Sequence, residues 1–281
     1  MSQLSLVFFT VLAQSAVGMF IALGLVELLY KPDRKIMTRS FMVALVLLAI
    51  GATASITHLG QPFRMFNVAF GLAHGSALSL EIVALSLFGG SAALYTGMRF
   101  IDYKPRLQKL LLPVAMGLGI VFVLAIANVY TLATVPTWST GFTPFQFLMT
   151  AAVVGPVAAA FILRAQSALD HEAPAQTERG LALSAALFTL IALTGYAAYL
   201  VWLGRLDVSF NPFDVVSNSV SLIAARIGLL FAGLALWLMS SAKVKAQSTS
   251  FLFLSFALIL SSELVGRIFF YDVYISASSG M

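Results

Sequence analysis

Long apolar stretches recur along the whole length of this protein, and each is long enough to cross a lipid bilayer as a helix. The hydrocarbon core of a bilayer is about 30 Å thick, a distance that about 20 helical residues span. A membrane β-barrel would instead show short segments of alternating polarity. We therefore expect an all-α integral membrane protein, one transmembrane domain over residues 1–281 with about eight helices, near 5–29, 40–57, 77–98, 108–131, 144–166, 180–203, 219–240 and 250–271.

The composition supports a membrane protein. Hydrophobic residues make up 60% of the sequence and charged residues 10%, whereas charged residues approach a quarter of an ordinary soluble domain. The mean hydropathy is +0.97. The first apolar stretch exceeds the core of a signal peptide and has no basic leader, so we expect it to be a retained helix. Membrane lipids, and no nucleic acid, are the expected surroundings.

Basic residues gather in alternate connections between these stretches and so predict the orientation. The positive-inside rule makes that side cytoplasmic, which gives a multi-pass membrane protein with both termini outside. The other side retains Arg64, Arg205, Arg226 and Arg267. The basic connections carry Lys31, Arg34, Lys35, Arg39, Arg99, Lys104, Arg106, Lys109, Arg164, Arg179, Lys243 and Lys245.

The residues that the sequence lacks restrict its chemistry. Without cysteine the protein can hold neither a thiolate-ligated iron–sulfur cluster nor a disulfide. Three histidines give poor support for membrane haem, and a haem bridging His58 and His74 is the one arrangement left open. No phosphate-binding loop, dinucleotide-binding glycine pattern or metal-ligand run occurs. We expect no haem, cluster or metal in this protein, so redox chemistry would need another cofactor or subunit.

One stretch, "ITHLGQPFRMFNVAFGLAHGSALSLEIV" at residues 56–83, concentrates polar groups at the predicted outer boundary. His58 ends the second apolar stretch, Arg64 and Asn67 follow it, and Glu81 lies about a turn inside the third. Ionisable groups at membrane depth are costly, and they usually pair or serve a functional pathway. The helix dipole alone favours a histidine at a helix end and a glutamate at a helix start, so a purely structural role stays open.

Further ionisable and aromatic side chains point to the same leaflet. Glu263 and Arg267 lie four residues apart and so predict a structural i,i+4 pair. Arg226, about two turns into the seventh stretch, is expected to be either their partner or a cation on the substrate side. Tyr130 and Trp138 occur where interfacial aromatic belts are expected.

This set suits the oxidation of a lipid-soluble quinol. The reaction needs a proton acceptor, for which His58 with Glu81 is the candidate. It also benefits from a cation that stabilises negative charge on the ring oxygen, for which Arg64 and Arg226 are candidates. Asn67 and Tyr130 complete the expected binding set, and Glu263, Arg267 and Trp138 are expected to support it.

Five segments, "HLGQPFRMFN" with "SALSLE", "TVPTW", "ARIGLL" and "ELVGRIFFY", resemble the DmsC-type membrane anchor of bacterial dimethyl sulfoxide reductases. The resemblance covers nearly the whole sequence and implies eight helices in the bacterial inner membrane. It implies that the anchor oxidises menaquinol near the periplasmic face, with its quinol-site histidine and glutamate at His58 and Glu81. It also implies two periplasmic partners: an iron–sulfur electron-transfer subunit and a molybdopterin catalytic subunit, which hold the clusters and the molybdenum cofactor.

Two other functions stay open at this point. A secondary transporter would show inverted repeats, broken helices and polar groups near the midplane. A purely structural anchor would use the ionisable set for packing and docking. The sequence leaves the terminal electron acceptor undetermined, because a different subunit selects it.

Overall fold

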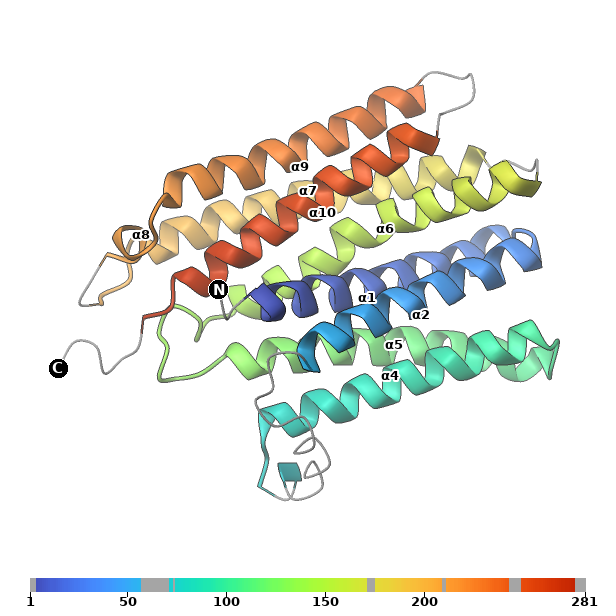
Figure 1. Cartoon of the computed structure of the whole chain (residues 1–281), viewed down its shortest axis with the longest axis horizontal. Helices are drawn as coiled ribbons and strands as arrows, with labels where there is room; N and C mark the ends of the chain where they lie inside the picture. Colours follow the sequence, from blue (N-terminus) through green and yellow to red (C-terminus); the bar gives the residue numbers. More distant parts are fainter. Residues whose placement is uncertain are drawn as a thin grey trace.

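The protein forms a bundle of long helices, shown in Figure 1. A computed structural model of the protein describes residues 4–56, 71–72, 74–170, 175–208, 211–242 and 249–275. Eight long helices and one short one, α8, make up this described part, and no strand occurs in it. Their bounds are α1 Leu4–Tyr30, α2 Arg34–Ile56, α4 Ala77–Phe100, α5 Pro105–Tyr130, α6 Phe142–Asp170, α7 Ala175–Leu203, α8 Pro212–Val215, α9 Ser219–Ala242 and α10 Thr249–Asp272.

The eight long helices confirm the predicted spans, because each is long and apolar enough to cross a membrane. Proline helps to set their ends. Pro32 follows the last residues of α1, and Pro105 occupies the first position of α5, where no backbone N–H is needed. The sequence did not predict the short helix α8. Asn211 caps it by accepting a hydrogen bond from the backbone N–H of Phe213 at 3.1 Å.

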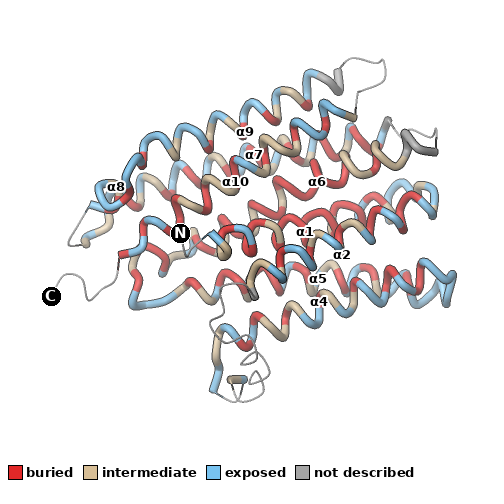
Figure 2. The backbone as a smooth tube through the Cα atoms, in the orientation of Figure 1, coloured by how far each residue is buried: buried red, intermediate tan, exposed pale blue. Residues whose placement is uncertain are grey.

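Helices α1 and α6 form the centre of the bundle and are the most buried of the eight spans. Figure 2 shows both as mostly buried, with α2, α4 and α5 on one side and α7, α9 and α10 on the other. Gly18 of α1 and Gly155 of α6 lie backbone to backbone, so a Cβ atom at either would overlap the other helix. Small residues at such a crossing let membrane helices approach closely.

The two ends of the bundle differ in character. The basic end holds the connections after Tyr30 and Phe100. The opposite end, which we call the terminal end, holds the start of α1 and the end of α10 (Figure 1). An even number of spans puts both ends of the protein on one side, as the orientation requires. That this side is the periplasm stays a prediction from the charge distribution.

Candidate functional site

A layer of buried polar side chains crosses the bundle near its terminal end. Each member is at most 8% exposed, although most lie inside apolar membrane spans. Such groups are costly in a bilayer unless they contact one another or a ligand. The members of this terminal polar layer are Thr10, Gln14, Glu81, Tyr130, Gln146, Thr150, Tyr196, Tyr199, Arg226, Glu263, Arg267 and Tyr271.

Glu263 is the anionic centre of this layer. Its Oε2 atom accepts a hydrogen bond from the Thr150 hydroxyl at 2.7 Å and lies 3.6 Å from Nη2 of Arg226. Gly266, one turn further along α10, leaves space for the Arg226 guanidinium, because a Cβ atom at this position would be only 2.6 Å from Arg226 Cζ. The predicted Glu263–Arg267 pair is therefore wrong, because Glu263 instead pairs with Arg226 of a neighbouring helix.

Arg267 is held by a separate set of contacts. Its Nη2 atom donates to Oε1 of Gln14 at 2.8 Å and to the Thr150 hydroxyl at 3.2 Å. Its guanidinium carbon lies 3.6 Å from the centre of the Phe147 ring and 5.6 Å from that of Phe270. These hydrogen bonds and cation–π contacts offset the cost of burying the Arg267 charge. Thr150 thus connects Glu263 to Arg267.

Arg226 is committed to protein contacts as well. Its guanidinium lies 4.0 Å from the centre of the Tyr196 ring, and Nη1 is 3.5 Å from Oε1 of Gln146. The carboxylate of Glu263 balances one of the two arginines, so Arg226, Glu263 and Arg267 together carry one net positive charge. The expectation that Arg226 partners Glu263 is confirmed, while its role toward a substrate stays a prediction.

Glu81 lies on the buried face of α4 and is 6% exposed. It forms no ion pair and no hydrogen bond with any side chain of the described residues, unlike Glu263. It lies within electrostatic range of Tyr130 and Tyr271, whose ring centres are 5.3 Å apart. A buried carboxyl group without a cationic partner among the described residues is suited to exchanging a proton with a bound molecule.

Tyr130 and Trp138 are buried rather than part of an interfacial belt, so that expectation is wrong. Each is 8% exposed, and their ring centres are 5.7 Å apart. Trp138 donates its indole N–H to the backbone carbonyl of Phe270 at 2.8 Å and stacks on the Phe270 ring at 5.4 Å. The loop between α5 and α6 is thereby fixed to the end of α10.

The structure brings together part of the predicted site. Glu81, Tyr130, Arg226, Glu263 and Arg267 all belong to the terminal polar layer. His58, Arg64 and Asn67 lie outside the described residues. His74 is exposed in the turn before α4. Sequence reasoning missed the uncharged members, although an amide inside an apolar stretch is itself a signal. These members are Thr10, Gln14, Gln146, Thr150, Tyr196, Tyr199 and Tyr271.

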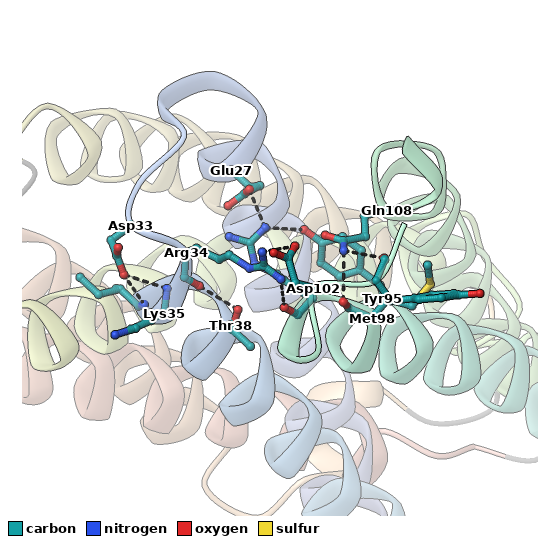
Figure 3. A network of polar contacts seen from close by, with 12 residues as sticks. Glu27, Asp33, Arg34, Lys35, Thr38, Tyr95, Met98, Asp102 and Gln108 are labelled. Atoms are coloured by element: carbon teal, nitrogen blue, oxygen red, sulfur yellow. Dashed lines mark hydrogen bonds and ion pairs between the residues drawn. The ribbon is translucent and has the colours of Figure 1, made fainter. Parts of the chain in front are cut away.

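A second polar network, shown in Figure 3, lies at the basic end. Arg99 of α4 pairs with Glu27 of α1 at 2.6 Å, and Arg34 of α2 contacts both Asp102 and the backbone carbonyl of Arg99. Gln108 of α5 donates to the carbonyls of Met98 and Tyr103 at 3.1 and 2.9 Å. This network joins four helices at that end.

An aromatic block separates the two polar regions. Glu81 and Arg99 lie eighteen residues apart on α4, about 27 Å along a helix axis. Between them Phe88 packs against Phe20 and Phe122, with ring centres 5.7 and 6.1 Å apart. No described polar group therefore links Glu81 to the basic end through this part of the core. Nor do the described residues include a group of three or more side chains suited to hold a metal ion.

Comparison with known proteins decides the family. The sequence model of the family described as "DMSO reductase anchor subunit (DmsC)" matches residues 1–273. The protein belongs to the DmsC family.

Curated relatives cover nearly the same length as this DmsC-family protein. It is 34% identical over 279 residues to "Anaerobic dimethyl sulfoxide reductase chain YnfH" of Escherichia coli K12, covering 96% of this protein and 94% of the relative. It is 32% identical over 284 residues to a second anaerobic dimethyl sulfoxide reductase subunit of the same strain, covering 96% and 94%. An anaerobic dimethyl sulfoxide reductase subunit of Haemophilus influenzae Rd is 29% identical over 278 residues, covering 98% and 95%. Family and spans together identify a multi-pass inner-membrane protein.

Proposed function

We propose that this protein is the membrane anchor of a molybdoenzyme complex and that it oxidises menaquinol at the terminal end of the bundle. The family supports the anchor role. The observation that carries the quinol reaction is Glu81, a buried carboxyl group without an ion-pair partner among the described residues. It lies five residues after Ser76, within the block "SALSLE" whose resemblance to the family first suggested a quinol site.

Oxidation of one quinol releases two protons and two electrons and leaves a quinone. In the proposed reaction one ring hydroxyl donates a hydrogen bond to His58, and Glu81 orients that imidazole or receives its proton. Arg64 and Asn67, from the same block, bind the ring oxygens, and Tyr130, within electrostatic range of Glu81, contacts the ring. Arg226, Glu263 and Arg267 support the site through their single net positive charge, which favours developing negative charge on the quinol.

The electrons require an acceptor outside this protein, since its sequence has no cysteine for a cluster. An iron–sulfur subunit docked at the terminal end would accept them and pass them to a molybdopterin catalytic subunit. The terminal acceptor belongs to that subunit, and dimethyl sulfoxide and trimethylamine oxide both remain candidates.

The protons should leave on the side where the quinol is oxidised. The aromatic block around Phe20, Phe88 and Phe122 lies between Glu81 and the polar network of the basic end. Dry, packed aromatic side chains offer no donors or acceptors to a proton. This separation also argues against a secondary transporter, whose polar binding groups usually lie near the midplane.

The test is to bind a fluorescent hydroxyquinoline N-oxide, a quinol analogue, to membranes that hold the assembled complex. We expect Glu81→Gln and His58→Ala to abolish fluorescence quenching or to lower quinol oxidation by about 10²–10⁴-fold, while the catalytic subunit stays attached. Glu178→Gln is the matched control, because Glu178 is also buried but pairs with Arg164 at 2.8 Å near the basic end. Unchanged binding and turnover in both variants would show that the two residues serve helix-end electrostatics in a purely structural anchor.

A further inference from the structure

An apolar groove of about 510 Å³ opens on one face of the bundle and extends from beside the terminal polar layer toward the basic end. Helices α1 and α6 form its floor, and α5 and α7 form its two walls. Nearly all of its lining is aliphatic, small or aromatic. The lining residues are Val17, Gly18, Ile21, Ala22, Leu25, Val26, Leu29, Tyr30, Ile120, Val123, Leu148, Met149, Ala151, Ala152, Pro156, Thr177, Gly180, Leu181, Ser184 and Phe188.

The groove is long in one direction. Its α1 lining runs from Val17 to Tyr30, which is about 20 Å along a helix axis. At the basic end, the hydroxyl of Tyr30 packs against Gly180 of α7, and a Cβ atom at this glycine would be 2.8 Å from that hydroxyl. The glycine therefore lets the Tyr30 side chain reach α7. A long apolar groove that ends beside a phenol hydroxyl suits a hydrocarbon tail whose polar head lies at the basic end.

Two lysines flank that end of the groove. Lys31 directly follows Tyr30, and Lys109 lies on the same face of α5 as Ile120, eleven residues or about three turns away. Both lysines are exposed, and neither forms an ion pair with a described residue. Arg34 and Arg99 of the basic end differ, since each is paired with a carboxylate.

We propose that the groove binds an anionic phospholipid, with one acyl tail along α1 and the phosphate between the ammonium groups of Lys31 and Lys109. The apolar lining recognises the tail, and the two cations select a headgroup with net negative charge. This site is separate from the proposed quinol site, because none of its lining residues belongs to the terminal polar layer and its two lysines lie at the basic end.

Native mass spectrometry of the full-length protein, released from nanodiscs of equimolar phosphatidylglycerol and phosphatidylethanolamine, tests the proposal. We expect one retained phospholipid with phosphatidylglycerol preferred, and a loss of about fivefold in that preference for each lysine replaced in Lys31→Gln and Lys109→Gln. Ala152→Phe, which narrows the groove without changing charge, should lower retention of both lipids together. Lys35→Gln is the matched control: Lys35 is an exposed lysine of the basic end on α2, which contributes no lining residue.

Three results would overturn the site. In the first, the preference for phosphatidylglycerol survives when Lys31→Gln and Lys109→Gln are combined, so these lysines do not bind the headgroup. In the second, Lys35→Gln reduces the preference as much as they do, which would mean nonspecific attraction to the basic end. Retention of an isoprenoid quinone instead of phospholipid, lost in Ala152→Phe, would assign the groove to the substrate tail. Circular dichroism of each variant verifies that the helical content is retained.

Discussion

Replacing the carboxylate of Glu263 should destabilise the protein strongly, because the buried Arg226 is paired with it. The carboxylate lies 3.6 Å from Arg226, where the attraction is about 4–5 kcal/mol at an effective dielectric constant of about 20. Removing one partner of a buried pair typically costs about 3–5 kcal/mol, since the other charge is left uncompensated. We expect Glu263→Gln to lower the free energy of unfolding by about 3–5 kcal/mol.

A double-mutant cycle isolates the pair. Arg226→Met in the Glu263→Gln background removes the uncompensated cation, so the two substitutions together should cost less than their sum, with a coupling energy of about 2–3 kcal/mol. The matched control is the ion pair of Arg34 and Asp102, whose side chains are 41% and 66% exposed. Its cycle should give less than about 1 kcal/mol, because solvent screens exposed charges.

Equilibrium unfolding of the purified full-length protein in mixed micelles with increasing dodecyl sulfate, followed by circular dichroism, supplies the free energies. A coupling energy no larger than that of the exposed pair would refute the reasoning. It would mean that Arg226 and Glu263 are each compensated by Gln146, Thr150 and the Tyr196 ring rather than by each other.

Three further substitutions probe other contacts. Gly155→Val should prevent stable folding, because its side chain would overlap the backbone of α1, whereas Gly117→Ala meets open space and should be tolerated in the same unfolding assay. Asp33→Ala should lower the free energy of unfolding by about 0.5–1 kcal/mol at pH 7, because the Asp33 carboxylate caps the start of α2. This carboxylate accepts hydrogen bonds from the backbone N–H groups of Lys35 and Ile36, which hold its pKa below the usual value. This stabilisation is complete at pH values above the pKa of Asp33 in the unfolded protein, and it is lost as the pH falls through the lower pKa of Asp33 in the folded protein. The free energies of unfolding of the wild type and of Asp33→Ala should therefore converge in acid. Trp138→Phe should cost about 1–3 kcal/mol and raise protease cleavage of the α5–α6 loop, because it removes the hydrogen bond to the Phe270 carbonyl.

The spans were predictable because apolar length is a property of each segment alone. The largest deviation is the start of α2, expected at residue 40 and found at Arg34. The positive charge of Arg34 and Lys35 favours a connection, yet these two residues begin the helix. The short helix α8 was missed because four residues carry no periodic signal, even though Pro212 after Asn211 is a common way to start a helix.

The candidate site was only partly predictable, since pairing between helices depends on their rotation and neighbours. The i,i+4 spacing favoured Glu263 with Arg267, but Gly266 makes room for Arg226 from α9 instead. Likewise, Trp138 was expected at the membrane–water interface, because the sequence shows that it lies between the ends of two apolar stretches. The sequence does not show that its indole contacts the end of α10. For Glu81 the motif indicated the position, while its burial, with no ion pair to any residue that the structure describes, emerged only from the fold.

The central position of α1 has a consequence for how the protein is made. α1 is synthesised first, yet Gln14 receives its hydrogen bond from Arg267, 253 residues later. A membrane helix satisfies its own backbone, so α1 can persist in lipid while its amide side chain waits for α10. Every nascent polypeptide therefore passes through a stage in which the core helix is inserted but its polar face is bare. Cells that monitor exposed polar groups within the bilayer would degrade polypeptides truncated before α10 and spare complete ones.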